Sequence, residues 1–464
     1  MGLIRIQRRA LEIVIEANST NEDDEVNIQT LVSKKNIYQK GPKIVVIGGG
    51  TGLNSMLVGL KKYTSNITAI VSVSSYGEPL SSSIKELDLN PVEDIKQSIV
   101  ALSLKEEEMS KLMNYEFTDR KLKSLSFGDI YLSAMKNIYG DFAGSIEKSS
   151  DVLSIVGRVL PVTLDEMKIC AELKDGTIIE EKSKINEIVS AKITEINRVY
   201  ISPSNCRTAP GIVEAIKEAD CIIIGPGSLY TNVIPNLLIK NVSKAIKESK
   251  AHKVYVSNIM TEPGQTDDYS VSEHIKAIID HAGEGIMNYC ICDTGEIVPE
   301  IMRKYNMQGS NLVDVDAAKI REYGLSIISG DYATIEGEYI RHNSDEVAKA
   351  IIELLINDLK FKDTRPDEQF VLLNTKLKQE NEKKKQEKKS LGKHSVRPKK
   401  ERRFKSLSKF AAKYEERIQS IKDSEKTRQH NIKIHKKAEE ITDEAEKKEK
   451  ERFLEETYTK KDKE

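Results

Sequence analysis

The sequence lacks most of the features that mark secreted, metal-stabilised or membrane-spanning proteins. Its 464 residues include five cysteines and no Cys-x-x-Cys pair, which excludes a disulfide framework and a structural zinc site. No apolar run approaches the roughly 18 residues that a membrane span needs. Residues 1–25 contain no continuous apolar core followed by small residues, so they do not form a secretory signal. We therefore expect a cytoplasmic protein in a reducing environment.

A large net charge is also absent, because 72 basic residues oppose 73 acidic ones. That balance hides an asymmetry along the chain. Residues 376–464 contain 30 basic and 19 acidic residues, a surplus of +11, which leaves 42 basic and 54 acidic residues, or −12, for the rest. The pattern indicates an acidic globular body followed by a basic tail.

The tail, residues 361–464, is rich in Lys and Glu and buries too little apolar surface to offset its chain entropy. We expect it to be disordered, except for a short amphipathic helix over 403–422. The apolar residues of that helix follow an a/d rhythm: Phe404, Leu407, Ala411, Tyr414, Ile418 and Ile421. Because so short a helix is marginal alone, we expect it to bind a partner, with a solvated tail as the alternative.

Residues 41–360 alternate short apolar runs with helix-period segments, which is the pattern of a βαβ protein. The runs KIVVIG, ITAIVSV, NRVYIS, DCIIIG and KVYVSN predict the strands of a mainly parallel sheet with helices on both faces. An Asp-Gly turn within residues 171–190 predicts an inserted antiparallel hairpin. The last apolar helix ends the body near Leu359, and residues 1–40 form a leader of unassigned role.

The first predicted strand ends in a glycine-rich turn that opens a helix, made of Gly48, Gly49, Gly50, Thr51 and Gly52. Backbone N–H groups and the helix dipole favour an anion at such a turn. The turn therefore predicts a phosphate contact, with close packing of strand and helix as the alternative. An NAD site would also need an acidic residue at the end of the second strand, where the sequence has Ser74 and Ser75.

A second turn repeats this pattern after the strand CIII. It contains Gly225 and Gly227 and is followed by the polar residues Ser228, Tyr230 and Thr231 at a predicted helix start. Two such turns at the carboxyl ends of strands predict a ligand with a diphosphate. A Gly-Pro-Gly turn capped by Ser228, without a ligand, is the alternative.

With both turns in view, the sequence resembles the bacterial gluconeogenesis factor family, which is similar to the archaeal 2-phospho-L-lactate transferases. The resemblance covers about residues 43–357 and rests on the motifs IGGGTGL, ITAIVSV, GRVLPVT, IGPGSLYTNVIPNLL, KVYVSNIMTEPGQT and IRHN. It implies a Rossmann-like α/β fold, a nucleotide or nucleotide-sugar ligand, and a cytoplasmic role in cell shape and peptidoglycan metabolism during gluconeogenic growth.

The first half of the chain departs from the family pattern in three segments. A segment with paired aspartates reads SSYGEPLSSSIK here, Pro-Gly-Asp-Ile-Arg reads VEDIK, and Gly-His-x-x-Gly-Asn reads SLSFGD. The departures imply that transfer chemistry is lost, and they leave Asp94 as a weak candidate for catalysis or for Mg²⁺ binding. The replacements stand at Ser75, Tyr76, Glu93, Lys96, Leu125 and Asp129.

The second half of the family pattern is better kept. A uracil-type base can stack on an aromatic ring, and a diphosphate can form paired hydrogen bonds with a guanidinium group. Tyr305 and Arg341 are therefore candidate ligand contacts. Their alternatives are a tyrosine packed on a helix and an arginine in a surface ion pair. No motif ties a Ser or Cys nucleophile to a histidine that could act as a general base. The other polar candidates and histidines are Asn258, Thr261, Glu262, Thr266, His274 and His342.

Together these observations predict a non-catalytic regulator that binds a UDP-sugar. Mg²⁺ would enter only with the ligand's phosphates, and no protein metal site is predicted. We expect a homo-oligomer and a cell-wall synthesis or envelope-associated partner bound through the tail, and we exclude sequence-specific nucleic-acid binding because the tail has too few aromatics to stack bases. The alternatives are a transferase acting on a nucleotide-activated donor and a scaffold acting through the basic tail.

Overall fold

The fold is given by a computed structural model of the chain. The structure describes residues 41–72, 93–117, 122, 125–361, 377, 378 and 382. The predicted leader, the segment 73–92 with its altered SSYGEPLSSSIK motif, and the tail with its helix over 403–422 lie outside the described residues.

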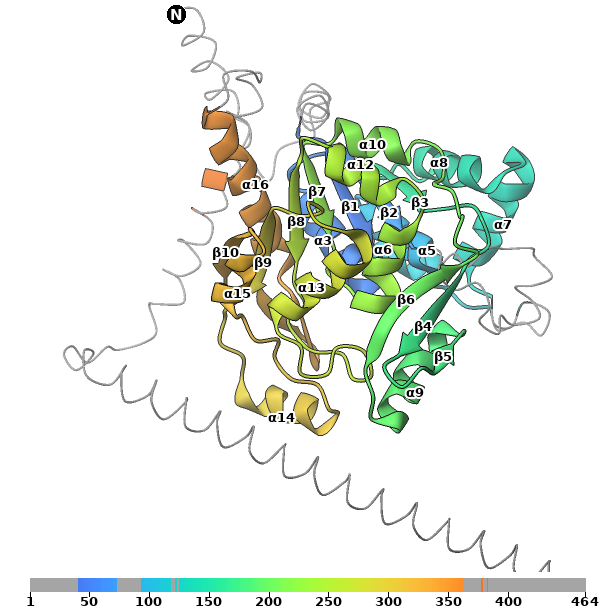
Figure 1. Ribbon diagram of the computed structural model, residues 1–464. Coiled ribbons are helices and arrows are strands. Elements are labelled where there is room, and N and C mark those ends of the chain that lie inside the picture. Colours follow the sequence, from blue (N-terminus) through green and yellow to red (C-terminus); the bar gives the residue numbers. More distant parts are fainter. Residues whose placement is uncertain are drawn as a thin grey trace, which may run out of the picture. The chain divides into compact units, whose positions relative to one another are not determined.

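Seven parallel strands form the central sheet in the order β10-β9-β8-β7-β1-β2-β3 (Figure 1). The chain adds β2 and β3 on one side of β1 and β7 to β10 on the other, so the strand order reverses between β1 and β7. In sheets of this kind ligands bind at the carboxyl ends of the strands beside the reversal. The strands are β1 Ile44–Gly48, β2 Ile67–Val71, β3 Arg158–Pro161, β7 Cys221–Ile224, β8 His252–Val256, β9 Tyr289–Asp293 and β10 Ser326–Gly330.

The middle of this sheet is built from runs of apolar residues because both of its faces are covered. Every residue of β1, β2 and β7 is buried. Ile47 pairs with Ile70 on one side and Ile224 on the other, so β1, β2 and β7 end at nearly the same level.

Helices cover both faces of the sheet, as the sequence predicts (Figure 1). One group packs around α3 and includes α5 and α16, and the other group runs from α10 to α13 and includes α15. The last helix ends within two residues of the predicted boundary. The helices are α3 Gly50–Leu60, α5 Glu93–Leu102, α6 Glu106–Met113, α7 Phe127–Tyr139, α8 Phe142–Val152, α9 Ile185–Lys192, α10 Ile212–Glu218, α11 Ile234–Leu238, α12 Val242–Glu248, α13 Val271–Ala282, α14 Pro299–Met307, α15 Ala317–Glu322 and α16 Ser344–Phe361.

A three-stranded antiparallel unit, residues 168–202 and here called the insert, interrupts the α/β pattern. It consists of β4 Lys168–Leu173, β5 Ile178–Ile179 and β6 Ile196–Ser202, with the short 3-10 helix η1 Lys182–Lys184 and α9 between β5 and β6. The predicted Asp-Gly hairpin is confirmed, and Gly176 in its turn has a φ of 84° that favours glycine.

One predicted strand is misplaced by the sequence analysis. The run NRVYIS was expected in the parallel sheet, but it forms β6 and pairs antiparallel with β4. The difference lies in its burial, because exposed Asn197 and Arg198 and half-buried Tyr200 interrupt its buried positions. A strand with one solvent-exposed face is typical of an antiparallel sheet.

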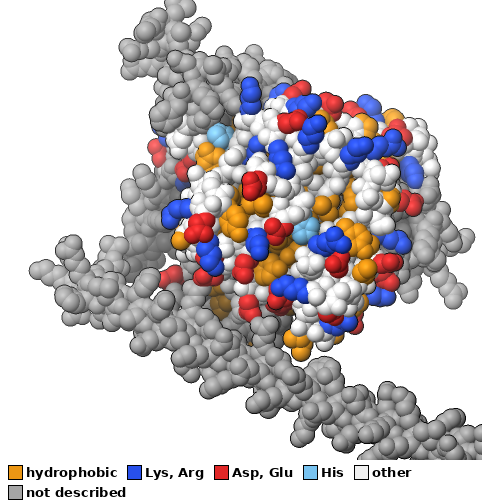
Figure 2. Space-filling model, viewed as in Figure 1, with side chains coloured by type: hydrophobic (Ala, Val, Ile, Leu, Met, Phe, Trp, Pro, Cys, Tyr) orange, Lys and Arg blue, Asp and Glu red, His pale blue; other side chains and the backbone are white. Residues whose placement is uncertain are grey.

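A second antiparallel pair, β11 Ala333–Glu336 and β12 Tyr339–His342, precedes α16. The five cysteines are free and buried. Within the described residues no helix has the length and apolar character needed to cross a membrane. Figure 2 shows basic and acidic side chains interspersed over one face of the molecule, so that face carries no stripe of a single charge.

Candidate functional site

The two glycine-rich turns meet at the point where the strand order reverses. The first glycine loop, Gly48–Gly52, follows β1, and the second glycine loop, Gly225–Ser228, follows β7. The N–H of Gly225 donates to the carbonyl of Ile47 at 2.9 Å. A β-carbon on Gly52 would lie only 2.5 Å from the carbonyl oxygen of Pro226, so the two backbones are in direct contact. The structure thus brings together the glycines predicted from two distant segments.

The first glycine loop presents the N-terminus of α3. Gly49 is extended and Gly50 has a φ of 67°, a conformation that glycine adopts without strain. The N–H of Gly50 donates to Asp94 Oδ1 at 3.1 Å, so a carboxylate occupies the position that favours an anion. Burial raises the pKa of the Asp94 carboxyl above its usual range, although the charge of Lys182 and the N–H of Gly50 oppose that shift.

Two side chains that the sequence analysis did not single out complete this corner of the site. The amide of Asn232 lies over the first glycine loop, since a β-carbon on Gly50 would be 3.2 Å from Asn232 Nδ2. Lys182, from η1 of the insert, donates from Nζ to Asn232 Oδ1 at 3.1 Å. The Lys182 and Asn232 positions are 50 residues apart, and no spacing rule links them. Only the fold could reveal the pair.

A buried hydroxyl faces the same loop from β2. Ser72 is 2% exposed, and its N–H donates to the carbonyl of Gly48 at 3.0 Å. Its Oγ has no hydrogen-bond partner in the described part of the chain. The Cβ of Ser72 lies 3.4 Å from the position of a β-carbon on Gly49, so this unused hydroxyl stands beside the loop. Buried polar groups are normally hydrogen-bonded, which makes the Ser72 hydroxyl a candidate ligand contact.

The polar residues after the second glycine loop mostly turn away from the site. Residues Leu229–Val233 form a π-helical turn before α11. Tyr230 is buried, and its hydroxyl lies 2.9 Å from that of Tyr269. Thr231 is also buried and accepts from Gln265 at 3.5 Å. Ser228 makes no side-chain capping bond, although its carbonyl accepts from the N–H groups of the following turn.

Of the candidates after β8, one contacts the glycine loops directly. Asn258 accepts from the N–H of Gly227 at 3.3 Å through its side-chain oxygen. Thr261 is buried, and its hydroxyl accepts from the N–H of Asn311, which fixes the loop rather than facing the glycines. Glu262 receives bonds from Asn186 of the insert and from Gln265 at 3.1 and 2.7 Å. This second contact region ties the insert to the loop after β8.

Tyr305 and Arg341 lie on neighbouring elements further along the same edge. The hydroxyl of Tyr305 on α14 accepts from the N–H of Ile340 at 2.9 Å, which joins α14 to β12. The guanidinium of Arg341 lies 5.0 Å from the ring centre of Tyr339. Both Tyr305 and Arg341 are half-buried. Contact of either residue with a ligand stays a prediction.

The two candidate histidines, His342 and His274, bond to backbone carbonyls. His342 Nε2 lies 3.0 Å from the carbonyl of Ser257, and its own carbonyl accepts from Ser55 of α3 at 3.2 Å. Burial lowers the pKa of His342 to about 4. His274 is buried with Nδ1 against the carbonyl of Ser270, and burial lowers its pKa as well. Both contacts are structural links to backbone carbonyls.

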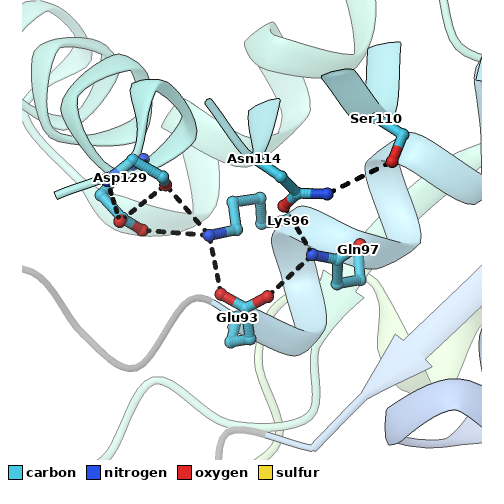
Figure 3. Close-up of polar contacts among 7 residues, drawn as sticks. Glu93, Lys96, Gln97, Ser110, Asn114 and Asp129 are labelled. Atoms are coloured by element: carbon cyan, nitrogen blue, oxygen red, sulfur yellow. Dashed lines mark hydrogen bonds and ion pairs between the residues drawn. The ribbon is translucent and has the colours of Figure 1, made fainter. Parts of the chain in front are cut away.

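Three of the departures from the family pattern form one ion-pair network (Figure 3). Lys96 is 4% exposed, and its Nζ lies 2.7 Å from Glu93 Oε2 and 3.5 Å from Asp129 Oδ1. It also donates to Ser126 at 3.0 Å, and Ser126 and Asp129 form the capping box of α7. The network joins α5 to α7 next to Asp94, and the ammonium of Lys96 balances the carboxylates of Glu93 and Asp129.

A protein-only metal site is not found among the described residues. No group of three or more His, Cys, Asp and Glu side chains there could hold a metal ion. Asp94 is near the first glycine loop, whereas Glu93 is directed to Lys96 (Figure 3). The Asp94 carboxylate together with ligand phosphates would fit Mg²⁺, which usually keeps few protein ligands.

The fold and this edge define an α/β protein with two glycine-rich turns at the reversal of strand order. The family model described as 2-phospho-L-lactate transferase CofD matches residues 44–333. The chain belongs to the gluconeogenesis factor family, also described as UPF0052. The resemblance seen in the sequence is therefore confirmed.

Named relatives agree with this assignment. The chain is 42% identical to a Clostridium acetobutylicum protein that bears the name gluconeogenesis factor provisionally, over 77% of this chain and 79% of that protein. It is 37% identical to the gluconeogenesis factor of Bacillus subtilis, over 68% and 98%. A Bacillus halodurans protein of the UPF0052 family has a crystal structure that matches with 38% identity and a TM-score of 0.63, over 68% of this chain and 100% of that one.

Proposed function

We propose that the chain is a cytoplasmic regulator that binds a UDP-sugar at the carboxyl edge of the sheet and acts in cell shape and cell-wall metabolism under gluconeogenic growth. One observation carries the proposal: both glycine loops meet at the reversal of strand order, with the N–H of Gly50 and the side chain of Lys182 beside them. A diphosphate is the ligand group that suits such a position.

The rest of the ligand would extend along the same edge. The second glycine loop is linked to Asn258, and β12 is linked to α3 and to the end of β8 through His342. Tyr305 offers a half-buried ring beside β12, and Arg341 offers a guanidinium on that strand. An aromatic face suits a uracil-type base and a guanidinium suits a phosphate.

Isothermal titration calorimetry of the full chain tests this function. UDP-N-acetylglucosamine, UDP-glucose, NAD and GDP are titrated with and without Mg²⁺. We expect a UDP-sugar to bind, and we expect Arg341→Ala to weaken it about 10-fold or more. Arg321→Ala is the matched control, because Arg321 is exposed and lies on helix α15 and not on strand β12. Absence of heat and of a thermal shift with every UDP-sugar would refute the proposal.

A transferase that uses a nucleotide-activated donor is the second candidate. It is supported by the match to the 2-phospho-L-lactate transferase model and by the position of Asp94 at the first glycine loop. It requires product formation with Mg²⁺ that Asp94→Asn abolishes. A panel of activated donors without any product would remove it, while leaving UDP-sugar binding open to the calorimetric test.

We also propose that the body is a homo-oligomer. The tail is proposed to contact a cell-wall synthesis or envelope-associated partner. Its support is the basic surplus of residues 376–464 and the a/d rhythm of residues 403–422. Deletion from Lys376 onward is expected to abolish localisation and complementation but to keep UDP-sugar binding. A deletion that leaves all three unchanged would remove the partner from the proposal.

A further inference from the structure

A lysine from the insert reaches the carboxyl edge of the parallel sheet. Lys182 stands in η1, between β5 and α9, and is half-buried, whereas Lys184 in the same turn is exposed and paired with Glu181 at 2.9 Å. The Nζ of Lys182 donates to Asn232 Oδ1 at 3.1 Å. The insert is anchored there independently, because Asn186 bonds to both Glu262 and Gln265.

The groups around the first glycine loop include hydrogen-bond donors and a positive charge that could bind an anion. Asn232 lies over Gly50, whose N–H is taken by Asp94. The hydroxyl of Ser72, 2% exposed, stands at Gly49 without a partner among the described residues. The helix terminus, the ammonium group and this unused donor all favour a negatively charged ligand group. The carboxylate of Asp94 is the acceptor at the N–H of Gly50.

We infer that Lys182 is a direct phosphate contact of this site, and that a ligand phosphate replaces Asp94 at the N–H of Gly50 and draws the Lys182 ammonium from Asn232. The inference rests on the proposed function for the rest of the ligand, but its phosphate step can be tested without a nucleotide. It also gives the insert a role, since ligand binding then changes the contact that ties η1 to the second half of the site.

The phosphate step is tested with inorganic pyrophosphate on the full chain in metal-free buffer, by calorimetry and thermal shift. We expect Lys182→Met to weaken pyrophosphate binding about 10- to 100-fold, the effect of one charge-assisted hydrogen bond. Lys182→Arg should restore much of the affinity, and Lys184→Ala should leave it unchanged. Unfolding curves show that each variant is folded.

Asp94→Asn is the complementary variant. Because it removes the negative charge that competes for the N–H of Gly50, we expect pyrophosphate to bind about 5-fold more tightly without metal. A purely structural pair would not move the affinities of Lys182→Met and Asp94→Asn in opposite directions. Equal affinity of Lys182→Met and the natural chain, weaker binding by Asp94→Asn, or no pyrophosphate binding by the natural chain would each overturn the inference.

A parallel titration with UDP-N-acetylglucosamine separates this inference from the proposed function. If pyrophosphate binds through Lys182 and the UDP-sugar binds more tightly, both stand. If pyrophosphate binds through Lys182 and UDP-N-acetylglucosamine binds no more tightly, the nucleotide-sugar function fails and the role of Lys182 stands. If the UDP-sugar binds equally to the natural chain and to Lys182→Met, the function stands and the inference fails.

Discussion

The two glycine loops are both rich in glycine and follow neighbouring strands, but they present different groups to the site. The first glycine loop opens α3 and offers the N–H of Gly50 to an acceptor. The second glycine loop is followed by a π-helical turn whose Tyr230 and Thr231 are buried in the core. The second glycine loop contributes the backbone at Pro226 to the site, and the turn after it contributes the amide of Asn232. A glycine-rich turn after a strand therefore marks the edge of a site but does not say which of its atoms face a ligand.

The contrast extends to the elements that support each loop. The acceptor on the first glycine loop, Asp94, stands on α5, which Lys96 joins to α7. The second glycine loop is supported by the loop after β8 through Asn258, and Asn232, in the turn that follows the second glycine loop, is held by Lys182 of the insert. The first support is an ion-pair network around buried Lys96. The second support consists of hydrogen bonds, one between neutral groups and one from the ammonium of Lys182 to a neutral amide. Variants can disturb the two supports separately.

The largest effect is expected from Gly52→Ala, which breaks the contact between the two loops. The new β-carbon would lie 2.5 Å from the carbonyl oxygen of Pro226, a backbone atom that cannot move aside locally. We expect a loss of about 3 kcal/mol in the free energy of unfolding, measured by denaturant titration.

Gly337→Ala is the control for Gly52→Ala, because a β-carbon there meets no atom of the described residues within 4 Å and its φ of 61° is the unfavourable feature. It should lose about 1 kcal/mol. Equal losses in the two variants would show that the loops can separate without strain.

A slightly smaller effect is expected from Lys96→Met, which removes the cation that supports the α5 side. Asp129 then keeps a mostly buried carboxylate without its ammonium partner. We expect a loss of about 2–3 kcal/mol in unfolding free energy, below the full cost of breaking a buried pair because Ser126 still bonds to Asp129.

Glu93→Gln is the matched variant for Lys96→Met, since the Glu93 side chain is 64% exposed. A loss of no more than about 1 kcal/mol is expected there. If Glu93→Gln were as harmful as Lys96→Met, the ion pair near the surface and not the buried one would hold α5.

Acid should weaken the contact between β12 and the end of β8. The pKa of His342 is lowered to about 4 by burial, so the folded state binds its proton less readily than the unfolded chain does. The stability that neutral His342 provides is complete above about pH 6.5 and is lost as the pH falls toward 4. We expect neutral His342 to contribute on the order of 1–3 kcal/mol to the free energy of unfolding. The unfolding free energy of His342→Gln should therefore depend less on pH than that of the natural chain. Parallel curves for the two proteins would contradict this.

The smallest effect sharpens the view that Tyr230 belongs to the core. Tyr230→Phe removes the hydroxyl that lies 2.9 Å from Tyr269, and we expect it to lose about 1 kcal/mol in unfolding free energy. Tyr269→Phe completes a double-mutant cycle. A coupling energy of about 0.5 kcal/mol or more is expected from the shared hydrogen bond. If the effects of the two substitutions were strictly additive, the two hydroxyls would not be bonded in solution.

Most of the sheet could be predicted because β1, β2, β7 and β8 are apolar runs of the length that a covered parallel strand needs. The error on β6 arose because a short apolar run does not reveal its pairing, although the polar Asn197 and Arg198 within it are a signal of one wet face. The hairpin was found because an Asp-Gly turn specifies its own local geometry.

The site was only partly predictable. The glycines could be found because they stand in recognisable local patterns at strand ends, and Asp94 was a candidate only through the family resemblance. Lys182 and Asn232 could not, because their contact depends on how the insert packs against the sheet. The ion pair of Lys96 with Asp129 was likewise hidden, since two substitutions read one at a time look like two losses. Their pairing is visible only in three dimensions.

The most direct test of the central claim is a crystal structure of the full chain with UDP-N-acetylglucosamine. The account predicts the diphosphate within hydrogen-bond distance of the Gly50 N–H and the Lys182 ammonium, with the Asp94 carboxylate moved from Gly50. A diphosphate bound elsewhere, with the Asp94 to Gly50 and Lys182 to Asn232 bonds intact, would contradict it.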